Sequence, residues 1–243
     1  MHPSRPAPVA VVLVHGAFAG TSSWAGVTPL LRRAGVSVHT PVNPLRGLAT
    51  DSAYLADVVR RIGGPVVLVG HGYGGAVVTQ AATCADNVVA LAYVAAFALD
   101  TGECLLDVVD RFAPMPLAHT ALTVGPGSTG RELLLRPHRF PQAYAADLPL
   151  PIGRELSRAQ RPLAPAALTD RSGAPAWARI PAWYALATAD RLLHPSAQRF
   201  MAQRMAAHEH PVDGSHALPL SRPAAVAAMI MAAARGTDPG GRW

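Results

Sequence analysis

VVLVGHGYGG, residues 66–75, decides the fold of this chain. Its first four residues are apolar and mostly β-branched, which is typical of a strand buried on both faces of a sheet. Four of the next six residues are glycine, and residues 74–84 have the composition of a helix. A buried strand that turns through glycines into a helix is the repeating unit of a doubly wound parallel sheet. We therefore predict an α/β chain with functional groups at the end of this strand.

The same alternation of strands and helices continues on both sides of this unit. Apolar strands are predicted at residues 9–14, 88–95 and 182–187, and further strands at residues 36–40 and 208–212. Helices are predicted at residues 24–33, 51–61, 196–207 and 224–234, with Asp51 as the N-cap of the second. Residues 100–180 are rich in Pro and Gly, have weak periodicity and contain no clear strand. The prediction is one α/β core over residues 1–99 and 181–243, with residues 100–180 inserted as a lid.

Composition favours a compact globule and excludes several other classes. The 243 residues are 50% hydrophobic and 15% charged, as in a domain with an apolar core. The longest apolar runs fall far short of the roughly 20 residues of a membrane span. The first run leads to His15-Gly16 instead of a cleavage site, so we predict a cytoplasmic protein with no membrane partner. Cys84 and Cys104 are interpreted as buried free thiols.

The charge is basic but dispersed. The net charge is +6, and every basic residue is arginine. The arginines form no basic run with interleaved aromatic residues, so no nucleic-acid partner is predicted. No pattern in the sequence specifies an oligomeric state.

Small and polar residues follow the predicted strands at four places. His15-Gly16-Ala17-Phe18 follows the first strand, and the glycine turn follows the strand at residues 66–69. Asp190 and Ser215-His216 follow the last two strands. Because the carboxyl ends of parallel strands lie at one edge of a sheet, we expect these segments to converge. Their order along the chain is the order nucleophile, acid, histidine.

The chain resembles the α/β-hydrolase superfamily over nearly its whole length. The likeness rests on VLVHGAF at residues 12–18, on Ser23-Trp24, on the glycine turn, and on DGSH at residues 213–216. In and near the inserted part it rests on DLP at 147–149, QRP at 160–162, AW at 176–177 and IP at 180–181. The chain looks most like the small lidded branch that includes plant hydroxynitrile lyases, plant methylesterases and bacterial esterases. This resemblance implies an α/β-hydrolase fold, with a mostly parallel, doubly wound sheet of about six strands and an inserted helical lid.

By the same resemblance, Asp190 is the triad acid and His216 its base, and the backbone N–H groups of Ala17 and Tyr73 form the oxyanion hole. Position 72 departs from the family pattern. The G-x-S-x-G elbow of the family holds a serine whose hydroxyl attacks the substrate, whereas Gly72 has no side chain. Glycine tolerates the strained turn, so the fold should survive. The acyl-enzyme route should not, which leaves roughly 10³- to 10⁴-fold catalysis over water from the remaining parts.

Other residues near these segments are candidates for contact with substrate: Phe18, His15, His71, Ser22 and Trp177. The two histidines could instead be packed, hydrogen-bonded supports of the turns. Ser22 and Ser23 could offer an alternative hydroxyl, or could cap the helix that begins at Trp24.

Four further residues and the glycine turn itself have rival interpretations. A phosphate-binding loop would also be rich in glycine, but this one lacks the Lys-Ser/Thr pair. Asp100, after the preceding strand, is the rival to Asp190. His208 and His210 share a strand face, but no third ligand is near, so no metal is predicted. Cys84 is expected in the core, and its alternative role is a replacement nucleophile.

Three functions are open. In the first, His216, polarised by Asp190, abstracts a proton from a small apolar carbonyl substrate whose enolate the oxyanion hole holds, as in a lyase, cyclisation, isomerisation or cofactor-free oxygen reaction. In the second, the protein is a serine ester hydrolase whose nucleophile has been replaced by Gly72. In the third, the pocket binds a small ligand without chemistry. The retained histidine and aspartate favour chemistry, and no metal or organic cofactor is implied.

Overall fold

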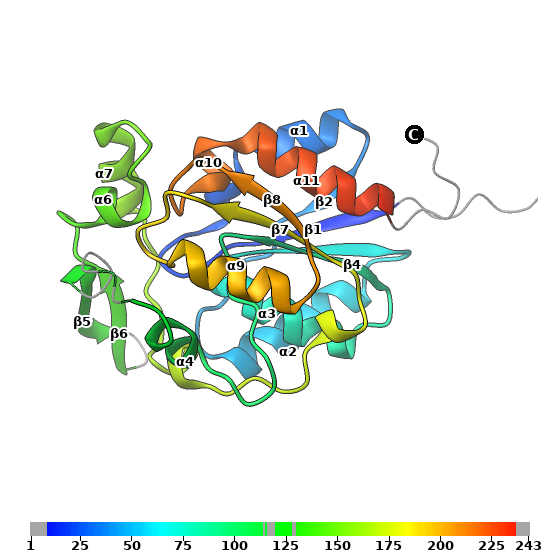
Figure 1. The fold of residues 1–243 in the computed structure, drawn as a ribbon, viewed down its shortest axis with the longest axis horizontal. Coiled ribbons are helices and arrows are strands. Elements are labelled where there is room, and N and C mark those ends of the chain that lie inside the picture. The colour runs from blue at the N-terminus through cyan, green and yellow to red at the C-terminus, as the bar shows by residue number, and fades with distance from the viewer. Residues whose placement is uncertain (1–8, 114, 116–119, 128–129, 237–243) are drawn as a thin grey trace, which may run out of the picture.

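Six parallel strands form the central sheet. The computed structural model describes residues 9–113, 115, 120–127 and 130–236, so residues 1–8 and 237–243 of the predicted core lie outside the described residues. The strand order is β2-β1-β3-β4-β7-β8, and each neighbouring pair is parallel (Figure 1). The strands are β1 (Ala10–Val14), β2 (Ser37–His39), β3 (Val66–His71), β4 (Val88–Val94), β7 (Ala182–Ala187) and β8 (His208–Val212). This architecture confirms the predicted α/β-hydrolase fold.

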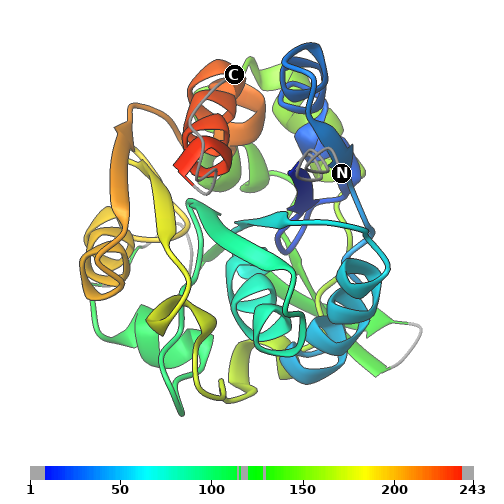
Figure 2. The same cartoon turned by 90° about the vertical axis from the view of Figure 1, so that its right-hand side faces the viewer.

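Helices cover both faces of the sheet (Figures 1 and 2). One face is covered by α1 (Thr28–Arg33) and α11 (Pro223–Gly236), and the other by α2 (Leu48–Arg60), α3 (Tyr73–Ala81) and α9 (Pro195–Arg204). Side chains of β1 alternate between the two cores, because successive residues of a strand point to opposite faces. Val11 and Leu13 pack with the first group of helices, whereas Val12 and Val14 pack with the second. A strand buried in this way must be apolar at every position, which is why β1 and β3 were recognisable from sequence.

Most of the segment between β4 and β7 lies at the carboxyl ends of the strands, and its last residues run back to the start of β7 (Figure 1). It contains α4 (Leu105–Asp110), β5 (Leu122–Gly127), β6 (Gly130–Leu135), α6 (Phe140–Tyr144), α7 (Leu150–Arg158), α8 (Ala166–Thr169) and the helical turn η3 (Ala176–Ala178). β5 and β6 form an antiparallel hairpin that the sequence did not predict. Its glycines and proline interrupt the alternation of apolar and polar residues by which a strand is recognised. The two strands are held by backbone hydrogen bonds to each other, which the sequence pattern does not reveal.

Two local expectations were wrong. Asp51 does not cap α2 but lies in its first turn, where it is buried and accepts hydrogen bonds from the N–H of Arg46 and from the Tyr73 hydroxyl. Cys84 is exposed in the turn η2 (Ala82–Cys84) and is not part of the core, whereas Cys104 is buried. Both thiols are free, as predicted.

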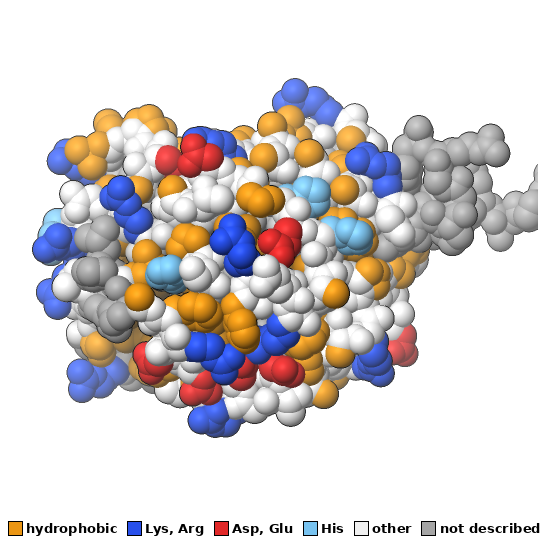
Figure 3. All heavy atoms as spheres, in the orientation of Figure 1, with side chains coloured by type: hydrophobic (Ala, Val, Ile, Leu, Met, Phe, Trp, Pro, Cys, Tyr) orange, Lys and Arg blue, Asp and Glu red, His pale blue; other side chains and the backbone are white. Residues whose placement is uncertain are grey.

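The surface mixes charges. On the face shown in Figure 3, basic side chains lie singly or in small groups among acidic and apolar ones. Within the described ranges, no helix combines the length and the apolar character needed to cross a bilayer.

Candidate active site

The turn between β3 and α3 holds Gly72 in a conformation that other residues rarely adopt. Its φ is 53° and its ψ is −122°, and a positive φ favours glycine because a Cβ would be crowded by the backbone. Gly75, one turn further on, lets α3 approach the next loop, since a Cβ there would lie 2.4 Å from the carbonyl oxygen of Phe97. The glycines therefore build a sharp strand-to-helix turn at the carboxyl end of the sheet.

His216, on the loop after β8, is joined to Asp190, on the loop after β7. The Nδ1 atom of His216 lies 2.8 Å from Oδ2 of Asp190, and both side chains are buried. Asp190 also accepts hydrogen bonds from the N–H groups of Leu192 and Leu193 and from Nε2 of Gln198, at 2.8–2.9 Å. These donors fix the carboxylate, so Nδ1 of His216 carries the proton and Nε2 presents a lone pair.

The free Nε2 atom of His216 faces Gly72. A Cβ built on Gly72 would lie 3.0 Å from this nitrogen, which is closer than an ordinary van der Waals contact. No described residue hydrogen-bonds to Nε2. The imidazole is therefore a base whose reactive nitrogen lies against the backbone of the turn, in the space that a side chain at position 72 would enter.

Two backbone N–H groups lie beside the same place. The loop after β1 lies against the turn, with the Cα of Gly16 3.8 Å from the Cβ position of Gly72. Ala17 follows in this loop, and Tyr73 is the first residue of α3. The N–H groups of both residues lack an acceptor among the described residues. A helix start carries unpaired donors and partial positive charge, so an oxyanion at this point would be stabilised.

An apolar cavity of about 170 Å³ opens beside His216. Ala17, Phe18 and Tyr73 line the cavity on the side of the turn. Apolar side chains from α4, the inserted segment and the start of α9 form most of the remaining wall: Leu105, Leu122, Leu163, Leu168, Leu193 and Ala197. Such an enclosure binds an apolar molecule and strengthens electrostatic interactions within it, because water is excluded.

His15 and His71 lie beneath the turn and do not border this cavity. Burial lowers the pKa of His15 from 6.5 to about 4, and burial, with the nearby charge of His216, lowers the pKa of His71 well below its usual value. His15 accepts the N–H of Asn43 at Nε2 (3.0 Å). His71 donates from Nε2 to the carbonyl oxygen of His216 (2.8 Å). Both are neutral supports of the two loops, so the predicted contact with substrate is not found for either histidine.

Three other candidates lie elsewhere. Ser22 is exposed and borders a separate small hollow, where the hydroxyl of Ser23 donates to the Gly20 carbonyl. Trp177 donates from Nε1 to the carbonyl oxygen of Leu99 (3.1 Å) and, with Asp100, borders a different surface hollow. Ser22 and Trp177 therefore do not line this cavity, and their contact with substrate stays a prediction. Asp190, not Asp100, is the partner of His216. Of the five predicted contacts, Phe18 lines the cavity.

Two residues with a structural part in the site were missed. Gln198, on α9, holds Asp190 in place, and its distance of eight residues from that aspartate gives no pattern to recognise. Arg161 reaches from the inserted segment to Nε2 of His15 (3.2 Å) and to the carbonyl oxygen of Asn43 (3.0 Å). The motif QRP at residues 160–162 contributed to the family resemblance, but the sequence assigned no role to its arginine.

A parallel sheet with a strand-to-helix elbow, a histidine–aspartate pair and two unpaired N–H groups defines the scaffold of an α/β-hydrolase. A sequence profile described as "Alpha/beta hydrolase family" matches residues 11–229. The chain belongs to the α/β-hydrolase family, as its motifs predicted.

Relatives of this chain include esterases. It is 33% identical over 116 residues to a carbendazim hydrolyzing esterase of Nocardioides sp. (strain SG-4G). This match covers 42% of the chain and 48% of that esterase, about half of its length.

Similar solved structures include a pyrethroid hydrolase from Sphingobium faniae JZ-2, with a TM-score of 0.78 and 23% identity over 96% of this chain and 100% of that one. Polyneuridine aldehyde esterase has a TM-score of 0.79 and 18% identity over 93% and 98% of the two chains. A methylesterase from Arabidopsis has a TM-score of 0.74 and 20% identity over 93% and 98%. At these identities the structures establish the shared fold.

Proposed function

We propose that this protein is an enzyme that acts on a small apolar carbonyl compound by general-base catalysis, without a covalent intermediate. His216 is the base, Asp190 orients and stabilises it, and the N–H groups of Ala17 and Tyr73 hold the developing oxyanion. The observation that carries the proposal is the free Nε2 of His216, which faces Gly72 at the edge of an apolar cavity. Nε2 is accessible from the cavity, so a substrate that fills the cavity displaces water from this lone pair, and a substrate proton would then satisfy it.

The reaction that suits this site begins at a C–H bond next to the substrate carbonyl. His216 takes the proton at Nε2, and the electron pair of the C–H bond moves into an enolate whose oxygen receives the two N–H groups. The carboxylate of Asp190 stabilises the imidazolium that forms. The imidazolium then returns the proton to another atom of the enolate, which gives an isomerisation, or donates it to the departing leaving group, which gives a lyase reaction. General-base catalysis of this kind contributes about 10²- to 10⁴-fold to the rate.

Deuterium exchange tests this proposal directly. In D₂O, the protein should catalyse exchange of the α-hydrogens of 2-heptanone, followed by proton NMR as loss of their signal. His216→Ala should lower the catalysed rate at least 100-fold, because the base is lost. Asp190→Asn should also lower it strongly, since the amide can fix the wrong tautomer of the imidazole.

A matched control is available on β8. His208 stacks on Trp183, with ring centroids 4.9 Å apart, and does not border the cavity. His208→Ala should exchange at the wild-type rate. Equal exchange by wild type and His216→Ala would refute the role of His216. No exchange by the wild type, together with unchanged ligand affinity in His216→Ala, would indicate a protein that binds without chemistry.

A second candidate is a serine esterase whose nucleophile is missing. It is supported by the elbow conformation of Gly72 and by the match to an esterase. Under this alternative, Gly72→Ser should gain hydrolysis of p-nitrophenyl butyrate, because the new hydroxyl would lie beside Nε2 of His216. Gly72→Ala supplies the same Cβ without the oxygen and is the control. Equal, background hydrolysis by both variants would exclude the esterase parent.

A further inference from the structure

The cavity wall has a second polar place, formed by Asp110 and His194. The other polar side chains on the wall are those of His216 and Tyr73, and the Tyr73 hydroxyl is already bonded to Asp51 (2.8 Å). Asp110 is the last residue of α4, and His194 directly precedes α9. Two helices therefore bring an acid and an imidazole to the wall of an otherwise apolar chamber.

The imidazole of His194 is held in one orientation. Its Nδ1 atom accepts the N–H of Ser196 (3.0 Å) and so caps α9. Its ring stacks on Phe112, with centroids 6.2 Å apart and planes 16° apart. Because Nδ1 is an acceptor, Nε2 carries the proton. None of the described residues accepts a hydrogen bond from this N–H, which makes it a donor available to a ligand.

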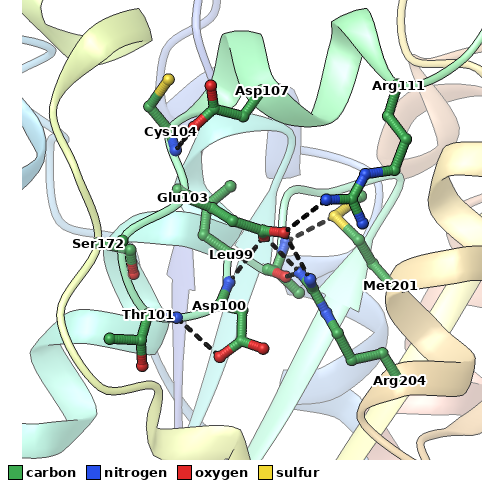
Figure 4. Close-up of polar contacts among 12 residues, drawn as sticks. Leu99, Asp100, Thr101, Glu103, Cys104, Asp107, Arg111, Ser172, Met201 and Arg204 are labelled. Atoms are coloured by element: carbon green, nitrogen blue, oxygen red, sulfur yellow. Dashed lines mark hydrogen bonds and ion pairs between the residues drawn. The ribbon is translucent and has the colours of Figure 1, made fainter.

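The carboxylate of Asp110 is also without a described partner, although arginines lie nearby. Figure 4 shows that Arg111 and Arg204 both point to Glu103. Arg204 is 2.8 Å and Arg111 is 3.5 Å from the Glu103 carboxylate. The guanidinium groups of both arginines also lie over the Phe200 ring, about 5 Å from its centre. The two basic groups next to the end of α4 are thus engaged with Glu103 and α9, and Asp110 is left as an acceptor on the cavity wall.

We propose that Asp110 and His194 bind the polar end of the substrate, remote from the carbonyl that meets His216. Both residues line the cavity, and Phe112, two residues after Asp110, stacks on the His194 ring. An acceptor and a donor brought near one another in this way suit a group that both donates and accepts, such as a hydroxyl group. The substrate class is then an apolar carbonyl compound with a hydroxyl at its far end. This inference rests on the proposed function, because it assigns the other end of the same substrate.

Binding of matched ketones tests the inference without any turnover. The probes are linear methyl ketones with four to eight methylene groups, each made with a terminal hydroxyl and with a terminal methyl. Dissociation constants are measured by NMR titration, and the readout is the ratio of the two constants at each chain length. At the length that spans the cavity, the hydroxyl should be favoured in the wild type by about 25-fold, because each of its two hydrogen bonds is worth about fivefold.

Variants separate the two polar groups from general effects on the cavity. Asp110→Ala should lower the preference to about fivefold, and so should His194→Asn, which keeps a side chain able to cap α9 but loses the Nε2 donor, because each variant keeps one of the two hydrogen bonds. The double variant should have no preference. Asp86→Asn is the control, because Asp86 is an exposed acid that does not border the cavity. It should keep the wild-type ratio.

Two results would overturn the inference: no chain length with a preference for the hydroxyl, or a preference that stays at the wild-type value in Asp110→Ala and His194→Asn. Failure of deuterium exchange with an intact preference would instead refute the proposed chemistry and leave this binding site standing.

Discussion

Replacing Gly72 by alanine should destabilise the protein by about 2 kcal/mol. Two effects contribute. A non-glycine residue held at a φ of 53° and a ψ of −122° is strained by about 1–3 kcal/mol. The added Cβ would also lie 3.0 Å from Nε2 of His216, so the imidazole must retreat by a few tenths of an ångström. For a domain of this size, about 2 kcal/mol corresponds to a decrease of about 4–8 °C in Tm.

Thermal and urea unfolding of wild type, Gly72→Ala and Gly102→Ala measure this cost. Gly102 has a φ of 78° but open space around its Cβ position, so its variant reports backbone strain without a contact. Gly72→Ala in a His216→Ala background reports strain after the contact is removed, and should cost less than in the wild type. If Gly72→Ala is as stable as the wild type, both the strain of the turn and the close approach of His216 Nε2 to position 72 are refuted.

Three further perturbations have defined outcomes. The pKa of His15 is 6.5 in an unfolded chain and about 4 in the fold, so the folded state binds fewer protons between these pH values. The free energy of unfolding should therefore fall by about 3 kcal/mol as the pH falls from 6.5 to 4. Urea unfolding of His15→Asn should show a smaller fall. Ile230 is fully buried under the sheet, and Ile230→Ala should cost about 3 kcal/mol in urea unfolding, against about 1 kcal/mol for Ile230→Val; equal costs would contradict its packing. A thiol reagent should label Cys84 in the native protein and Cys104 after unfolding, since one is exposed and the other buried; rapid native labelling of both would contradict this difference.

The sequence predicted the sheet better than the parts that cover it. β7 and β8 begin and end where the sequence placed them, at residues 182–187 and 208–212. β7 is buried and apolar throughout, so its pattern depends little on the rest of the chain, whereas β8 is polar and partly exposed and was predicted from the alternation of strands and helices. The hairpin at residues 122–135 was missed, because each of its strands contains glycine and depends on its partner for hydrogen bonds.

The same distinction divides the candidate site. His216, Asp190 and the glycine turn follow strand ends, so topology alone brings them to one edge. Ser22 and Trp177 belong to sequence motifs of the family, but they border other surface hollows. The direction of a side chain on a loop is set by packing against distant segments, which the local sequence does not contain. Asp110 and His194 went unnoticed for the same reason, since α4 and α9 are far apart in the chain.

The energetics of the histidine–aspartate pair argue for a ligand with an acidic hydrogen. Burying Asp190 and His216 removes both from water, and replacing such a pair by apolar residues is often neutral or stabilising. Nε2 of His216 has no protein donor in the described part of the chain and is accessible from the cavity. A ligand that fills the cavity excludes water from this acceptor, and an acceptor left unpaired in that way costs about 1–3 kcal/mol. A pocket that bound purely apolar ligands would leave that cost in place. A ligand that presents an O–H, an N–H or an activated C–H to Nε2 offsets it, and the last of these is the group whose proton the imidazole can remove next to an oxyanion site.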